Sequence, residues 1–325
     1  MPLQYRGGAY ASDGTLIPES CLWRLLASGM DCATVPYPSL PDPTASLSVG
    51  VFGGTLFPHF VHLMVESTAR SWWLLKNEPS LPLILQFQAE TDVVPSYFQK
   101  LFALAGIKTH IVPRGHLVEV KRLIIPEPAL VERKHAHPDF LLFFDKVRTA
   151  ALSHGKYPDY GTHLFVMRGQ GVAQVFGEDV VSKELERQGY RMLDPSVVSM
   201  EEQISAFAGA THIVGSIGSA MHNVVYANKA QKVAYLVRTG SVSTTFPSID
   251  QACGLYEAHY LYVGLTPLPV HGPLKGPYLI DAEMACHHLF EAGFLPHRVN
   301  LTLSDVIASR DAYMAQWAAG APKQP

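Results

Sequence analysis

Charged residues are scarce in this sequence, and their scarcity excludes several classes of protein. Only 16 % of the 325 residues are charged, the formal net charge is -3, and no long basic run occurs. Nucleic-acid-binding proteins carry basic patches, so no nucleic acid is expected as a partner. Long apolar runs are also missing. No stretch approaches the roughly 18 apolar residues of a membrane-spanning helix, which leaves only peripheral membrane contact open.

Cysteine is rare as well, with four residues in the chain. The four cysteines form no Cys-x-x-Cys pair and no other tight metal-ligand spacing; they are Cys21, Cys32, Cys253 and Cys286. The opening residues, MPLQYRGGAY, do not resemble a signal peptide. We therefore expect reduced thiols in a cytoplasmic protein, with the inner face of the membrane as a further location. A Cys21–Cys32 disulfide is the alternative.

Hydrophobic residues, by contrast, make up 48 % of the chain, enough for the cores of one large or two medium domains. The first 50 residues, rich in Gly, Pro and Ser, are predicted to be irregular apart from one helix in CLWRLLASG (21–29). From residue 51 helices and strands alternate, which predicts a doubly wound α/β fold. Predicted helices include 58–76, 138–155, 281–293 and 303–319.

The alternation occurs as two series, which favours two Rossmann-like domains over one barrel. We place the N-terminal domain at residues 1–140 and the C-terminal domain at 141–280. Residues 281–325 are expected to form helices that pack back across the domains. Homo-oligomerisation is left open.

The stretch GGTLFPHFVHLMVESTARSWWLL (53–75) combines polar and apolar residues in an unusual way. His62, Glu66 and Arg70 are spaced four apart, so they would share one face of a helix. A purely structural helix would scatter its charges over the outer face. We expect this face to line a cleft. The alternative is a buried His–Glu–Arg network that joins two elements.

A glycine-rich turn between a strand and a helix stands out in ATHIVGSIGSAMHNVVYANKA (210–230). Backbone N–H groups of such a turn approach a phosphate closely, and the helix dipole favours negative charge. The alternative is a tight turn whose glycines serve packing. Upstream, Arg168 ends a predicted strand, where it is suited to gripping a diphosphate. Glu178 opens the next helix. The alternatives are a surface charge for Arg168 and a dipole-complementing charge for Glu178.

These pieces, in this order, resemble glycosyltransferase family 61, a group that includes bacterial capsular-polysaccharide transferases. FPHFVHLMVESTAR is similar to the family's His-x-x-x-Glu helix with a following Arg, and MRGQGVAQVFGED to its strand-Arg segment. The most specific block is LDPSVVSMEEQISAFAGATHIVGSIGSAMHNVVYA (193–227), where separate features recur at matched spacing. The resemblance covers about residues 51–263.

The resemblance implies a GT-B-like fold, with two Rossmann-like domains facing a cleft, and inverting sugar transfer. It implies a nucleotide-sugar co-substrate on the C-terminal domain, a carbohydrate or glycoconjugate acceptor on the N-terminal one, and no other cofactor. Metal independence is usual for such folds, and the chain has no Asp-x-Asp motif.

An inverting transfer needs a base near the acceptor hydroxyl and positive charge on the leaving diphosphate. Glu66 is our first choice for the base, with His62 as its orienting partner or as the base itself. His59 and Arg70 are expected on the acceptor side. The expected donor-binding residues are Arg168, Glu178, Gly215, Ser216, Gly218, Ser219 and Asn223.

The chain departs from the family pattern at several positions on the donor side. Ile217 replaces the donor-loop His, Ala173 and Gln174 replace arginines, and Gly177 replaces the Asn before Glu178. His222 would compensate for the lost His, but a helix-surface histidine is the plainer interpretation. These losses favour a rival: a degenerate GT-B-like protein that binds a glycan or nucleotide.

A second rival is a metal-dependent hydrolase. Two pairs of histidines would supply its ligands: His59 and His62 in the first helix, and His135 and His137, which would share one face of a strand.

Overall fold

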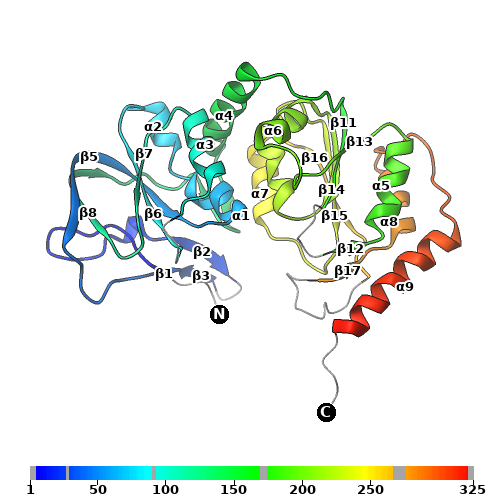
Figure 1. Ribbon diagram of the computed structural model, residues 1–325, viewed down its shortest axis with the longest axis horizontal. Helices are drawn as coiled ribbons and strands as arrows, with labels where there is room; N and C mark the ends of the chain where they lie inside the picture. The colour runs from blue at the N-terminus through cyan, green and yellow to red at the C-terminus, as the bar shows by residue number, and fades with distance from the viewer. Residues whose placement is uncertain (1–4, 27–28, 90–92, 169–173, 266–275, 321–325) are drawn as a thin grey trace, which may run out of the picture. The chain divides into compact units, whose positions relative to one another are not determined.

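A computed structural model describes residues 5–26, 29–89, 93–168, 174–265 and 276–320. The chain divides into two compact units, shown as a ribbon in Figure 1. The first contains Met1–His154 and Ser243–Cys253, and the second contains Gly155–Val242 and Gly254–Pro325.

The first unit is built on a four-stranded parallel sheet with the order β7-β6-β5-β8. Its strands are β5 (Pro43–Leu56), β6 (Leu83–Phe87), β7 (Thr109–Val112) and β8 (Leu117–Ile124). The long β5 pairs with β8 through its first half and with β6 through its second half. Strand β6 is buried along nearly its whole length, because helices cover a parallel sheet.

Helices α3 (Ser96–Leu104) and α4 (Leu141–His154) pack on each other, and α4 also contacts α2 (Trp72–Lys76). The α3–α4 contact is aromatic: the Phe102 and Phe143 ring centroids lie 5.0 Å apart. The predicted domain boundary after residue 140 would assign α4 to the second domain. In the structure α4 is part of the first unit, which extends to His154. The short helix α7 (Thr245–Ala252), which packs on β10 (His135–Ala136), also belongs to it.

The second unit contains a five-stranded parallel sheet with the order β13-β11-β14-β15-β16. Its strands are β11 (His163–Val166), β13 (Arg191–Leu193), β14 (His212–Ser216), β15 (Lys232–Val237) and β16 (Glu257–Tyr262). The chain leaves β11 for β13 on one side and returns for β14 on the other. The strand order therefore reverses between β11 and β14, where open α/β sheets bind ligands at the carboxyl ends.

Helices flank both faces of this sheet (Figure 1). Helix α6 (Met200–Gly209) lies on one face, and α5 (Glu178–Arg187) and α8 (Ala282–Glu291) pack together on the other. Helix α9 (Leu303–Gly320) contacts the two-stranded sheet of β12 (Val175–Phe176) and β17 (Tyr278–Leu279). The predicted α/β class with parallel sheets is thus confirmed. None of the helices in the described ranges is long and apolar enough to cross a membrane.

The predicted irregular start is wrong in two places. CLWRLLASG contains no helix over its described residues. Instead, β2 (Trp23–Leu26) and β3 (Gly29–Cys32) pair as an antiparallel hairpin, and the Leu25 N–H donates to Glu132 O. These tertiary contacts override the helix propensity of the leucines. Residues 43–50 are not irregular either: they form the first half of β5, with Pro43 at its first position, where a strand tolerates proline.

The predicted single helix at 58–76 is interrupted. A short α1 (Phe60–His62) leads into the π-helical segment η2 (Leu63–Ser67), and after a turn the chain continues as α2. The Ser67 hydroxyl donates to Thr55 O at the end of β5, which fixes the widened segment to the sheet. A π-helical segment inserts extra chain per turn and often marks a functional site. Residues spaced four apart across it therefore do not all share one face.

Candidate active site

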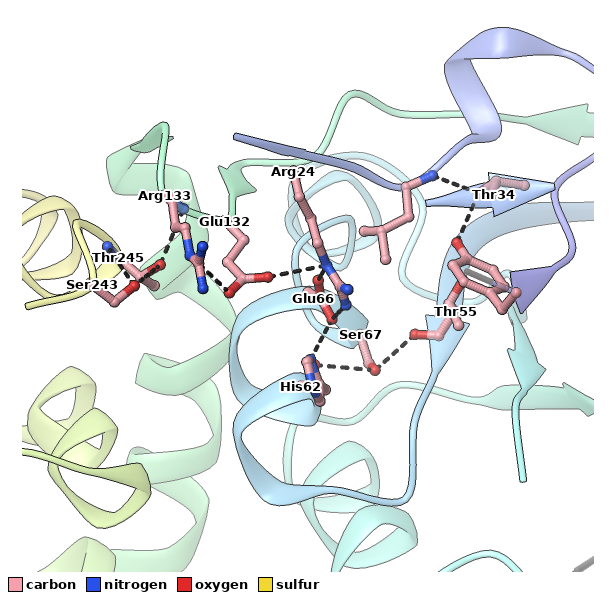
Figure 2. A network of polar contacts seen from close by, with 12 residues as sticks. Arg24, Thr34, Thr55, His62, Glu66, Ser67, Glu132, Arg133, Ser243 and Thr245 are labelled. Carbon is pink, nitrogen blue, oxygen red and sulfur yellow. Dashed lines mark hydrogen bonds and ion pairs between the residues drawn. The ribbon is translucent and has the colours of Figure 1, made fainter. Parts of the chain in front are cut away.

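A buried polar network surrounds Glu66 in η2 (Figure 2). Arg24 from β2 grips this carboxylate with two nitrogens: Nε lies 2.7 Å from Oε1, and Nη2 lies 3.0 Å from Oε2. Nδ1 of His62 lies 2.7 Å from Oε2. Glu132, beside β9 (Leu130–Val131), places its Oε2 3.0 Å from Arg24 Nε. Both oxygens of Glu66 are therefore engaged.

Burial and charge act against each other at Glu66. Burial by itself would raise the pKa of this carboxyl, but hydrogen bonds from His62 and Arg24 outweigh it and hold the pKa below its usual value. Burial raises the pKa of Glu132, and the neighbouring Glu66 charge raises it further. Glu66 is thus a stable anion whose two oxygens both accept hydrogen bonds, which makes it a weak base.

His62 is the more accessible member of the pair. Its side chain is 27 % exposed, against 3 % for that of Glu66. Because a carboxylate only accepts hydrogen bonds, His62 Nδ1 donates to it, and Nε2 of the neutral ring is left as an acceptor. His59 stands beside it, with ring centroids 5.5 Å apart. Burial lowers the pKa of His59, as does the neighbouring His62.

Arg70 does not join this network. Its side chain is buried, and the guanidinium donates to the carbonyls of Pro126 and Glu19, the latter at 2.7 Å. Arg70 and Glu66 line a hollow of only about 30 Å³, the space of a single water. The arginine that pairs with Glu66 is Arg24, so the alternative of a buried His–Glu–Arg network holds for His62 and Glu66 but not for Arg70.

Two arginines of the second unit converge on one glycine. Arg168 follows β11 and Arg238 follows β15, on either side of β14. A Cβ atom at Gly218 would lie 2.8 Å from Arg168 Nη1 and 3.7 Å from Arg238 Nη1. The buried Nε and Nη1 atoms of Arg238 have no hydrogen-bond partner within the described residues. This arrangement fits an anion at the carboxyl ends of β11, β14 and β15.

The electrostatics of this pair agree with an anion site. Burial lowers the pKa of Arg168 to about 10, and the nearby Arg238 charge contributes. Burial also lowers the pKa of Arg238. Both groups remain charged at neutral pH, so an incoming anion relieves their repulsion. Glu178, at the start of α5, is buried, which raises its pKa, and its Oε2 accepts the Arg168 backbone N–H at 3.2 Å.

The remaining predicted donor residues have mixed surroundings. A Cβ at Gly215 would meet Met221 Sδ at 2.6 Å and the Val166 carbonyl at 3.0 Å, so this glycine serves strand packing. Asn223 is fully buried and donates to Gln203 Oε1 of α6. Ser216 is buried and Ser219 is exposed. The segment that follows is the 3-10 helix η4 (Ser219–Tyr226), not the predicted α-helix.

The positions that depart from the family pattern are only partly described. Ile217 directly follows β14 and is buried, and its N–H donates to Leu236 O of the neighbouring strand β15. Gln174 O accepts the Tyr278 N–H, while Ala173 lies outside the described residues. Gly177 packs against Ile280, whose carbonyl would lie 2.7 Å from a Cβ there.

Replacing Gly218 with alanine tests the anion site. The backbone there is extended, with φ 169, so alanine causes no backbone strain. Its methyl group would instead displace the Arg168 guanidinium. We expect nucleotide affinity to fall at least tenfold with an unchanged melting temperature, measured by titration calorimetry and thermal unfolding. Gly240→Ala, with open space around its Cβ, is the matched control; equal affinity in both variants would contradict the site.

His222 is buried, so the interpretation as a helix-surface histidine is wrong. Burial lowers its pKa from 6.5 to about 4. The folded state therefore holds a neutral ring, and the unfolded state takes up a proton first as the pH falls. Its contribution to stability is complete above about pH 6.5 and is lost progressively toward pH 4.

The shift at His222 corresponds to about 3 kcal/mol of acid destabilisation. The free energy of unfolding falls when the pH is lowered from 7 to 4.5. We expect this decrease to be about 2 to 3 kcal/mol smaller in His222→Gln than in the wild type. Urea unfolding at the two pH values measures this difference. An equal loss in both proteins would place the acid sensitivity elsewhere.

Within the described residues, no group of three or more His, Cys, Asp or Glu side chains is placed to hold a metal ion. The four cysteines are free thiols, so the Cys21–Cys32 disulfide is not formed.

Three residues of these clusters were missed by sequence reasoning: Arg24, Glu132 and Arg238. Arg238 carries the same signal as Arg168, an arginine at the carboxyl end of a buried strand, and a search for that signal finds it. Arg24 and Glu132 show no such local signal. Arg24 lies 42 residues from Glu66 in the sequence, and Glu132 lies farther along still, so their contacts depend on the fold.

The chain matches the sequence model of Glycosyltransferase 61 over residues 57–234, more than half of its length. The protein therefore belongs to glycosyltransferase family 61. The matched region contains His62, Glu66, Arg168 and Gly218. No curated protein matches the chain.

Proposed function

We propose that this protein transfers a hexosyl or pentosyl group from a nucleotide-sugar donor to a carbohydrate or glycoconjugate acceptor, with inversion at the anomeric carbon. The observation that carries the proposal is the pair of arginines, Arg168 and Arg238, that face Gly218 within a chain of this family. The proposed setting is polysaccharide biosynthesis in the cytoplasm or at the inner face of the membrane. The proposed arrangement is GT-B-like, with no metal or further cofactor.

In the proposed mechanism His62, not Glu66, is the base. His62 Nε2 takes the proton of the acceptor hydroxyl while that oxygen bonds to the anomeric carbon. The bond from the anomeric carbon to the diphosphate oxygen breaks, and the nucleoside diphosphate leaves with the electron pair. Arg168 and Arg238 stabilise its charge. Glu66, fixed by Arg24, orients the imidazole and stabilises the imidazolium.

A thermal-shift titration with UDP, GDP, CMP, ADP and their sugars tests the donor side. A ligand that binds only the folded state raises the melting temperature. We expect one nucleotide to stabilise the wild type but neither Arg168→Ala nor Arg238→Ala. Product analysis by NMR with that nucleotide's sugar then reports the anomeric configuration. Retention would overturn the inverting mechanism.

The degenerate binding protein remains the second candidate because of one observation. Ile217 holds the place of the family's donor-loop His, and its side chain is buried. Nucleotide-dependent stabilisation without turnover of any sugar nucleotide would favour this candidate over the enzyme.

A further inference from the structure

A pocket of about 660 Å³ opens at the carboxyl ends of three parallel strands in the first unit. Phe57 directly follows β5, Gln88 directly follows β6, and Arg114 comes two residues after β7; all three line it. This edge is where open α/β sheets bind ligands. The volume lies within the range of small-molecule sites. Neither the family match nor the sequence patterns assign a role to this pocket.

The lining carries positive charge and aromatic rings. Arg6 and Arg114 contribute exposed guanidinium groups, and none of the described residues that line the pocket is acidic. Over the residues that the structure describes, neither guanidinium takes part in an ion pair or hydrogen bond. The forked donors of arginine match a carboxylate or a phosphate. Tyr37 and Phe57 supply apolar surface against which a sugar ring packs.

The backbone of the segment that carries Arg6 is hydrogen-bonded to side chains at the end of β6. Gln88 Nε2 donates to Arg6 O at 2.9 Å. One residue pair further in, the Gln86 side chain accepts from the Gly8 N–H and donates to the Gly8 carbonyl, both at 2.8 Å. The segment that carries Arg6 is therefore fixed to β6 before any ligand binds, which lowers the entropy cost of binding.

The pocket adjoins the proposed base. The Phe57 ring that lines it lies 5.2 Å, centroid to centroid, from the His62 imidazole. It also contacts the Tyr5 ring at 5.4 Å, and Tyr5 is a second lining residue. A saccharide held here therefore packs against a ring that also contacts His62, the proposed base.

We propose that this pocket binds an acidic saccharide, so that the acceptor of the reaction carries a carboxylate or phosphate held by Arg6 and Arg114. The role of this saccharide as the acceptor rests on the proposed function. The binding of an acidic saccharide in this pocket does not depend on that function. It commits to an anionic glycan and excludes a neutral one as the preferred acceptor.

Ligand-detected NMR titration with three probes tests the site: methyl β-D-glucuronide, glucose 6-phosphate and neutral methyl β-D-glucoside. The expected result is at least tenfold tighter binding of one charged probe than of the neutral one. Arg6→Gln and Arg114→Gln should each weaken that binding at least fivefold. Arg122→Gln, an exposed arginine of β8 outside the pocket, is the matched control and should leave it unchanged.

Equal binding of all three probes, or no detectable binding, overturns the proposal. So does a charge preference that survives in the Arg6→Gln/Arg114→Gln double variant. If Arg238→Ala loses the preference for the charged probe and Arg6→Gln keeps it, the probe binds at the proposed donor site. That result would overturn the proposal as well. The preference of the uronate over the phosphate, or the reverse, identifies which acid the acceptor carries.

Hydrolysis of the nucleotide sugar without acceptor separates this proposal from the proposed function. Charge-dependent binding without any sugar-nucleotide turnover would refute the transferase and leave the acidic-saccharide site intact. Transfer to neutral glycans at the same kcat/KM as to acidic ones would refute the acidic acceptor and leave the transferase intact.

Discussion

His62→Ala is expected to lower the rate of sugar transfer by about 100- to 10,000-fold, the usual contribution of a positioned general base. Binding of the nucleotide sugar should not change, because the proposed donor-binding residues Arg168 and Arg238 lie in the other unit. Steady-state kinetics at saturating donor measure the loss, and the nucleotide-dependent thermal shift checks donor binding. His297→Ala removes an exposed histidine of the second unit and should keep wild-type rates.

Glu66→Gln separates the two assignments of the base. If His62 is the base, this variant retains partial activity, because the amide still accepts the hydrogen bond from His62 Nδ1 but no longer stabilises the imidazolium. If Glu66 is the base, Glu66→Gln loses activity as completely as His62→Ala. His62→Ala with activity within tenfold of the wild type would refute the histidine base.

Arg24→Met should destabilise the first unit by about 3 to 5 kcal/mol, the cost of breaking a buried ion pair. The side chains of Arg24 and Glu66 are only 10 % and 3 % exposed. Without the guanidinium, the Glu66 carboxylate faces the Glu132 carboxyl without its main partner. Urea unfolding followed in the first unit measures this loss of unfolding free energy.

Two comparisons make this result specific. Arg187→Met breaks an exposed pair with Glu184 on α5 and should cost about 1 kcal/mol or less. The double variant Arg24→Met/Glu66→Gln removes the unpaired charge and should recover part of the stability. A loss below about 1 kcal/mol for Arg24→Met would show that the network adds little to stability.

Local sequence signals account for most of the regular structure. Apolar runs such as LILQF and KVAYLV form buried parallel strands, the structure that short apolar runs between helices favour. Two helices end at a glycine in the same way: Gly106 and Gly189 take positive φ, 71 and 96, just after α3 and α5. That conformation favours glycine, so a glycine at the end of a helical pattern indicates where the helix ends.

Where the local signals failed, tertiary contacts decided. The leucines of 21–29 favour a helix in isolation, yet Arg24 must reach Glu66, and the segment pairs as a hairpin instead. The four-residue spacing of the first motif predicted that Arg70 would accompany Glu66. The π-helical η2 breaks that phase, and Arg70 meets the Pro126 carbonyl.

The sequence by itself determined the α/β class, the alternation of helices and strands after residue 51 and the residues that mark the family, because helix and strand periods and glycine conformations are properties of neighbouring residues. Only the tertiary structure decided which groups meet: Arg24 with Glu66, Arg168 and Arg238 at Gly218, and Arg6 with Arg114 at one pocket. Each of these groups comes from a separate strand or loop. A charge far along the chain acts on its partner only after the sheets have brought their strand ends together.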